Sequence, residues 1–174
     1  MAKIVGAPVV FVGYGVKAPE RGWDDFKGVD LKGKVIVFLV NDPDYANPDE
    51  TGPFKGRRMT WYGRWPYKYE EAARQGAAGA LIVHDTFPAA YGWNVVRNSW
   101  SNEQVYLADD KDPKLQAAAW IQYEVAQTLF AAAGLKLDEQ IAASDARGFK
   151  AVELPVRLQA HVASAIRKFT SPNV

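Results

Sequence analysis

The sequence predicts a mixed α/β (α+β) fold with a central βαβ unit and an antiparallel pair of strands near the C-terminus. Residues 35–40 and 80–84 are unbroken apolar runs, as expected of strands that are covered on both faces. Residues 66–76 lie between them and have the pattern of one short helix. Apolar and polar residues alternate over 156–162, which is typical of a half-buried strand, and residues 165–170 are expected to return antiparallel to it.

The helix over residues 66–76 has a defined beginning and end. Pro66 suits the first turn, where its missing N–H costs nothing. Glu70 and Arg74 form an i,i+4 pair that also complements the helix dipole, and Gly76 is a natural stop. Small and aromatic side chains recur at the spacing of a core-facing stripe, at Tyr69, Ala72, Ala73 and Gly76.

The remaining predicted elements are shorter. They are a strand over residues 9–12, a strand near 120–123, a helix over 125–133 stopped by Gly134, and a helix capped by Asp138 that ends near Gly148. The Gly13-Tyr-Gly15 segment after the first strand is a lone G-x-G that opens no helix, so it predicts a turn and not a phosphate loop.

Two long irregular segments, residues 41–65 and 87–114, are expected to leave the same edge of the sheet, because strands 35–40 and 80–84 are parallel. Ligands of open α/β sheets bind outside the carboxyl ends of the strands. The two segments interleave aromatic residues with arginines, which is the composition of a contact surface. The alternative is that they fold back and bury their aromatic side chains as a satellite core, and both interpretations stay open.

Composition excludes several classes of partner. The formal net charge is +1 and neither sign forms a long run, which argues against nucleic acid or an anionic membrane as the main partner. No apolar run reaches the ~18–20 residues of a membrane span. No signal peptide is visible at the Met1 end. The alternative that a targeting segment has been removed from the native protein stays open.

No catalytic or metal-ligating set is found in the sequence, so no cofactor is expected in this chain. It has no cysteine, and His84 and His161 are its only histidines, too few for a typical catalytic zinc. The motifs H-E-x-x-H and G-x-S-x-G are absent. His84 is interpreted as structural. Acidic residues over 41–50 offer oxygen ligands to calcium, but they fit no EF-hand and turn chemistry explains them equally well.

Seven segments, in order, are similar to those of one domain family. They are Val10-Phe-Val-Gly-Tyr-Gly15, Gly22-Trp-Asp-Asp25, Asp30-Leu-Lys-Gly-Lys-Val-Ile-Val37, Asn41-Asp-Pro-Asp44, Thr60-Trp-Tyr-Gly-Arg-Trp65, Lys68-Tyr-Glu-Glu-Ala-Ala-Arg-Gln-Gly-Ala-Ala-Gly-Ala-Leu-Ile-Val-His84 and Asn98-Ser-Trp-Ser101. The chain thereby resembles the protease-associated (PA) domain inserted in bacterial zinc aminopeptidases, which are relatives of glutamate carboxypeptidase II and the transferrin receptor.

The resemblance implies a single swivelling β/β/α domain over residues 5–172, which belongs to a larger two-zinc peptidase. Such a domain is a non-catalytic accessory that covers the active-site cleft of an exopeptidase and limits access to peptides. Its implied partners are the catalytic peptidase domain of the same polypeptide, which holds both zinc ions, and the peptide substrate. The parent is expected to be periplasmic or secreted. Because an inserted domain brings its ends together, the strand near 9–12 is expected beside residues 165–170.

The substrate-facing or partner-facing residues that we expect on this basis lie in the two irregular segments. They are Trp61, Tyr62, Arg64, Trp65, Asn98 and Trp100. An arginine there is suited to holding a substrate carboxylate with two hydrogen bonds. The alternative is a receptor-like module that binds a protein or peptide, or that dimerises the parent, without peptidase activity.

Overall fold

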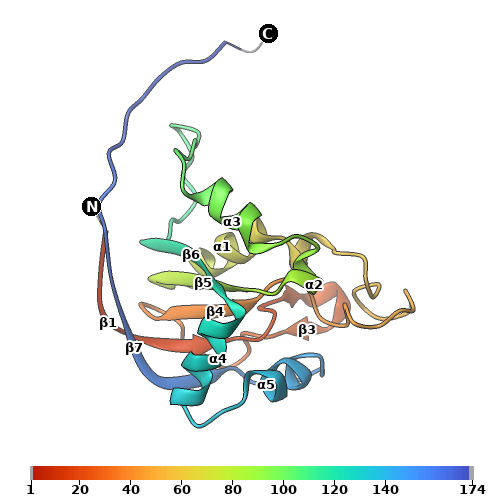
Figure 1. Cartoon of the computed structure of the whole chain (residues 1–174). Coiled ribbons are helices and arrows are strands. Elements are labelled where there is room, and N and C mark those ends of the chain that lie inside the picture. The colour runs from red at the N-terminus through yellow and green to blue at the C-terminus, as the bar shows by residue number, and fades with distance from the viewer. Residues whose placement is uncertain (1, 173–174) are drawn as a thin grey trace.

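The computed structural model describes residues 2–172, and a curled five-stranded mixed sheet lies at its centre (Figure 1). The strands are β1 (Ala2–Phe11), β4 (Val35–Leu39), β5 (Gly79–His84), β6 (Ala117–Gln122) and β7 (Val152–Val162), in the spatial order β6-β5-β4-β1-β7. The first four are mutually parallel, and β7 runs antiparallel to β1. A separate antiparallel pair joins β2 (Lys17–Ala18) to β3 (Trp23–Asp24). The predicted mixed α/β class is therefore confirmed.

Helices cover both faces of the sheet (Figure 1). They are η1 (Pro19–Arg21), η2 (Trp61–Gly63), α1 (Trp65–Arg74), α2 (Thr86–Ala89), α3 (Trp93–Trp100), α4 (Tyr123–Ala132) and α5 (Leu137–Ser144). One core joins Ile36 and Ile82 of the sheet to α1 and α3, and the other joins Val37 and Val83 to α4 and α5. Alternate residues of each central strand thus face opposite cores, which explains the unbroken apolar runs. Within residues 2–172, no helix is both long and apolar enough to cross a membrane.

The central βαβ unit is confirmed, since β4 and β5 pair in parallel with α1 between them. The predicted apolar stripe of the helix is only partly right. Ala72 and Ala73 are buried, but Tyr67 and Lys68 are buried as well, and Tyr69 is only half-buried. The reason is tertiary: the loop after β1 covers this side of the helix, so that the Tyr67 hydroxyl accepts a hydrogen bond from the Lys17 backbone N–H at 3.0 Å.

The predicted partner of the last strand is wrong. β7 has the expected alternation, but it pairs with β1, and residues 165–170 form no strand. Residues 9–12 consequently lie beside the start of β7, where Val9 is opposite Leu154, and not beside residues 165–170. β1 is longer than predicted because two register shifts near Gly6 and Pro8 interrupt its pattern without ending the pairing.

Two local predictions in the second half of the chain are also corrected. Residues 87–114 are not irregular throughout, because they contain α3 and most of α2. Asp138 does not cap the helix that follows it: Lys136 is the N-cap residue, and Asp138 lies in the first turn, where it accepts a hydrogen bond from the Tyr123 hydroxyl. That helix ends at Ser144 and not near Gly148.

The predicted turn at Gly13-Tyr-Gly15 is confirmed, and Gly15 is required there on two grounds. Its backbone has a φ of 62°, in the left-handed region that favours glycine. A Cβ atom on Gly15 would lie 2.1 Å from Cε1 of Phe38, inside the core. Gly28 has a similar φ of 78°, but a Cβ atom there would meet nothing within 4 Å.

We therefore predict that Gly15→Ala lowers the free energy of unfolding by about 3 kcal/mol, combining left-handed strain with overpacking. Gly28→Ala should cost only about 1 kcal/mol, since it has the strain without the clash. Urea denaturation of the two variants and the wild type measures the difference. Equal losses for both variants would show that Phe38 relaxes freely away from the new methyl group.

Candidate functional site

The six predicted site residues lie at the amino end of α1 and on α3. Trp61 and Tyr62 belong to η2, Arg64 is the N-cap residue of α1, and Trp65 is its first residue. Asn98 and Trp100 lie in the last turn and a half of α3. The structure brings the two helices together through their aromatic side chains.

Trp65 and Trp100 form the contact between these helices. Their ring centroids are 5.4 Å apart in an edge-to-face arrangement, and Tyr69 lies 5.5 Å from Trp100. Edge-to-face aromatic pairs of this kind contribute about 0.5–1.5 kcal/mol beyond the area they bury. This cluster fixes α3 against α1 and leaves Trp65 45% exposed.

Trp61, Arg64 and Trp65 together form an exposed surface, called here the Trp-Arg surface. Trp61 is 56% exposed, and the Arg64 side chain forms no ion pair with any residue from 2 to 172. The surface lies at the amino end of a ten-residue helix, where the dipole favours an anion. An exposed guanidinium close in sequence to two exposed indoles is chemically suited to a carboxylate with an adjoining apolar group.

Tyr62 and Asn98 do not join this surface. The Tyr62 hydroxyl donates to Glu20 Oε1 at 2.8 Å, and its ring packs edge-on against Tyr67 at 5.0 Å. Phe54, next to Tyr62, is fully buried, so part of the 41–65 segment folds back as the alternative predicted, but its aromatic side chain joins the main core and not a separate satellite core. Asn98 is exposed on α3, and its backbone oxygen accepts from the Asn102 side chain at 2.7 Å.

The two histidines take different positions. His84 is buried at the end of β5, its Nε2 lies 3.0 Å from the backbone oxygen of Tyr91, and its ring packs against those of Tyr91 and Trp93. These contacts hold the segment that leads into α3 and support the structural interpretation of His84. His161 is exposed on β7, opposite Lys3.

The acidic residues after β4 organise their own loop. Asp42 accepts hydrogen bonds from the backbone N–H and the hydroxyl of Thr60, and Asp44 Oδ2 accepts from the Phe54 N–H at 3.1 Å. These bonds support the interpretation as turn chemistry. In the part of the chain that the structure describes, no three His, Asp or Glu side chains converge as metal ligands would.

A buried charged cluster escaped the sequence analysis. Lys68 has no exposed surface, and its Nζ donates to the backbone oxygen of Tyr14 at 2.6 Å. Burial lowers the pKa of Lys68 to about 7, against the opposing influence of Asp42 and Asp25. Burial likewise raises the pKa of Asp25 to about 6, although Val16 N–H and the Trp23 indole donate to its carboxylate. Lys68 is thus a buried ionisable group that joins α1 to the turn after β1.

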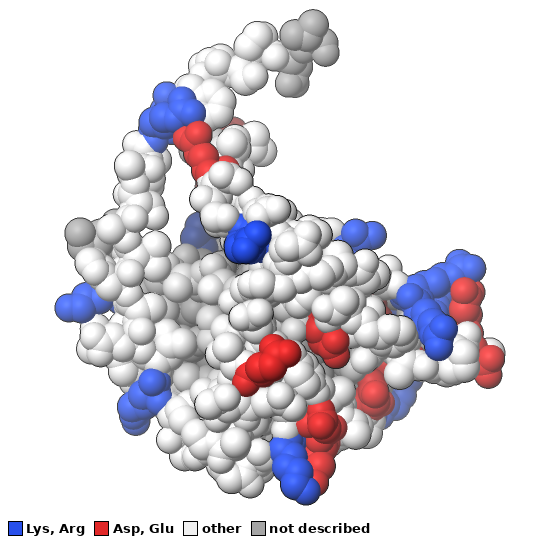
Figure 2. Space-filling model, viewed as in Figure 1, with Lys and Arg blue, Asp and Glu red and all other residues white. Residues whose placement is uncertain are grey.

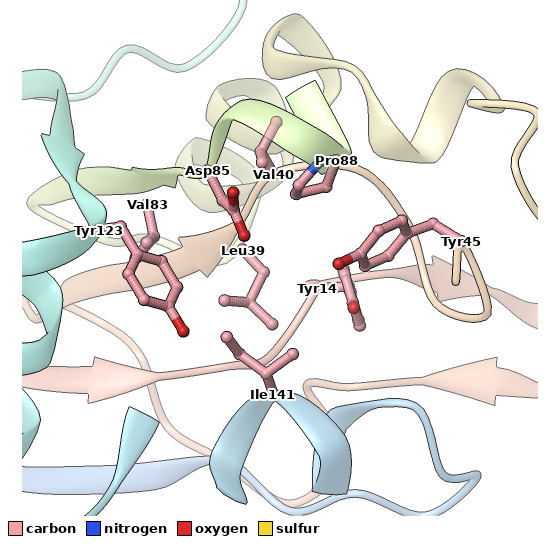
Figure 3. A pocket seen from close by; sticks show the side chains of 9 residues that line it. All are labelled: Tyr14, Leu39, Val40, Tyr45, Val83, Asp85, Pro88, Tyr123 and Ile141. Atoms are coloured by element: carbon pink, nitrogen blue, oxygen red, sulfur yellow. The ribbon is translucent and has the colours of Figure 1, made fainter. Parts of the chain in front are cut away.

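The sequence analysis also did not identify the residues that line a hollow at the carboxyl edge of the sheet, although the predicted topology pointed to this edge. The hollow lies on the α4 and α5 side and has a volume of about 320 Å³. Tyr45, Asp85 and Tyr123 line it (Figure 3), and each follows the carboxyl end of a different parallel strand. That shared position after a strand is the signal in the sequence that would have found them.

Comparisons of the chain with models of known protein families, with curated proteins and with solved structures find no significant match. The resemblance to PA domains therefore rests on the sequence segments given above.

The buried lysine predicts a specific dependence of stability on pH. Between about pH 7 and 10 the unfolded chain keeps the Lys68 proton that the folded chain has released, so the contribution of this group to stability rises with pH, by up to about 1.4 kcal/mol per unit. We expect Lys68→Met to lose that rise, as shown by urea unfolding at pH 7, 8 and 9. Asp25, whose pKa is raised to about 6, changes the dependence of stability on pH only below this range.

Lys27→Met is the matched control, because Lys27 is exposed. It should follow the wild type across this range. A stability difference between wild type and Lys68→Met that stays constant from pH 7 to 9 would contradict the assigned pKa.

Proposed function

We propose that this chain is a non-catalytic accessory domain of the PA type, which covers the active-site cleft of a zinc exopeptidase of the aminopeptidase kind and contributes to peptide binding. The observation that carries the proposal is the Trp-Arg surface, in which exposed Trp61, Arg64 and Trp65 lie together at the amino end of α1. The segments that resemble PA domains include this stretch.

The surface is suited to one end of a short peptide. Arg64 can donate two parallel hydrogen bonds to a terminal carboxylate, and the dipole of α1 adds to the attraction. The indoles of Trp61 and Trp65 offer apolar area to the last side chains of the peptide. The hydrolytic chemistry would belong to a peptidase domain of the same polypeptide, which would hold the two zinc ions. The parent would be periplasmic or secreted.

The pairing of β1 with β7 supports insertion into a larger protein. β1 and β7 pair along most of their length, so that Ala2 lies opposite Val162. The two ends of the folded part thus meet at one place on the surface (Figure 1). A domain inserted into a loop of its host needs this proximity of its ends.

A receptor-like or dimerising module is the second candidate, and one observation favours it. Val105, Tyr106 and Leu107 are consecutive and 70%, 70% and 80% exposed, and apolar surface of this kind marks a contact with another protein. The sequence of the parent gene beyond Val174 discriminates the two candidates. Two-zinc ligands with a catalytic glutamate support the peptidase, and their absence supports the receptor-like module.

For the peptidase candidate we predict that Arg64→Ala in the intact parent lowers kcat/KM about 10- to 100-fold for short peptides with a free carboxyl terminus. This corresponds to the loss of hydrogen bonds to a charged group, about 1.5–3 kcal/mol. Peptides with an amidated carboxyl terminus should be affected much less, because Arg64 has no carboxylate to bind in them.

Arg157→Ala is the matched control, since Arg157 is an exposed arginine on β7 whose guanidinium bonds only to the backbone oxygen of Gly6. Its kcat/KM should match the wild type. If Arg64→Ala leaves kcat/KM unchanged for both kinds of peptide, Arg64 has no role in the substrate pocket.

A further inference from the structure

We propose that the segment after β7, residues 163–172, binds the loop before β6, residues 101–116, and covers its exposed apolar stretch Val105-Tyr106-Leu107. The first segment is called here the strap and the second the acidic loop. Neither contains a helix or strand, and all of their residues except Leu115 are exposed. Figure 1 shows both of them projecting beyond the sheet on the same side of the domain. The inference does not rest on the proposed peptidase function, and it can be tested on this chain alone.

One ion pair already joins the two segments. Arg167 donates from Nε to Glu103 Oε1 at 2.8 Å and from Nη2 to Glu103 Oε2 at 2.9 Å, and these hydrogen bonds lower the pKa of the Glu103 carboxyl. Two parallel hydrogen bonds fix direction as well as distance. Figure 2 shows basic and acidic side chains in contact where the segments meet. An exposed ion pair contributes little by itself, so the strap needs further contacts.

The charges of the two segments are complementary. The acidic loop has four acidic and two basic residues, whereas the strap has two basic residues, Arg167 and Lys168, and no acidic one. Net charges of opposite sign attract the whole segments and not only the two paired side chains. Such complementarity selects one partner among several and fixes how it lies.

Apolar side chains flank the ion pair on both segments. The apolar stretch begins two residues after Glu103, while Ile166 and Phe169 lie one residue before and two residues after Arg167. Ile166 is 90% exposed and Phe169 is 55% exposed, and the Phe169 ring centroid is 5.1 Å from Arg167 Cζ. An extended chain rises only about 3.5 Å per residue, so local changes of backbone torsion suffice to bring the two apolar groups together. Their burial supplies the hydrophobic contribution that the ion pair lacks.

The strap is favoured over a second molecule as the occupant because it is already tethered to the acidic loop. Contacts within one chain do not require the loss of translational and rotational freedom that association of two molecules does. The strap would fix the direction in which the chain leaves β7. It would also make the apolar stretch unavailable to the partner of a receptor-like module.

The test is NMR spectroscopy of the 174-residue chain at low and high protein concentration. We expect nuclear Overhauser contacts from Ile166 and Phe169 to Leu107 at both concentrations. The heteronuclear NOE of the strap amides should be close to that of β7, as for an ordered segment. The carboxyl signal of Glu103 should titrate with a pKa below that of an unperturbed glutamate.

Variants separate the ionic part of the contact from the apolar part. Arg167→Glu should remove the contacts and give the strap the heteronuclear NOE of a free tail, and adding Glu103→Arg should restore both by exchanging the charges. Leu107→Ser should weaken the contacts without changing any charge. The matched controls are Lys150→Glu and Val125→Ser, at exposed positions outside both segments, which should behave as the wild type does.

Three results would overturn the proposal. The first is a strap that is as mobile in the wild type as in Arg167→Glu. The second is contacts that appear only at high protein concentration, which would assign the apolar stretch to a second copy of the chain. The third is a strap that Leu107→Ser leaves as ordered as Val125→Ser does. None of these bears on the role proposed for Arg64, which is measured with peptide hydrolysis by the parent.

Discussion

The arrangement of this domain depends on one buried ionisable group, the amine of Lys68. Burying it in its charged form costs several kcal/mol, so the fold must surround it with compensating groups. The Tyr14 carbonyl accepts its hydrogen bond, and the carboxylates of Asp25 and Asp42 favour its charged form. These groups come from the turn after β1, the end of the β2–β3 pair and the turn after β4. One side chain of α1 therefore ties three irregular segments to the sheet.

This constraint determines what the amino end of α1 presents to solvent. Tyr67 and Lys68 are both directed inward, where they meet Lys17 and Tyr14, and they fix the rotation of the helix about its axis. Arg64 and Trp65, just before them, are left exposed. Trp65 then has Trp100 of α3 as its neighbour. The exposure of the Trp-Arg surface thus follows from the burial of Lys68, because that burial fixes the rotation of α1 about its axis.

The sequence predicted those parts of the fold that local pattern controls. The apolar runs that became β4 and β5 were clear because both of their faces are buried, and the alternation in β7 was clear because one face is. The pairing of β7 with β1 was not predicted, since it joins residues about 150 positions apart and two shifts near Gly6 and Pro8 blur the pattern. No local signal marks a lysine as buried: Lys68 becomes so only when tertiary structure brings its partners to it. For the same reason, the sequence pointed to Trp65 and Trp100 as site residues but could not show that Tyr62 lies outside the Trp-Arg surface.

The carboxyl edge of the sheet carries two surfaces of opposite character. On the α1 and α3 side, exposed Arg64 at the amino end of α1 favours an anion. On the α4 and α5 side, the lining of an open hollow carries negative charge from Asp85, Asp138 and Asp145. The sheet and its two cores lie between the helices of the two sides, so that the charges do not neutralise one another. The formal net charge of +1 is therefore the sum over all charged residues, and it does not reveal that opposite charges lie on opposite sides of the sheet. Near-neutral composition argues against partners that read charge over a large area, such as nucleic acid, but it leaves open local sites for ions of either sign.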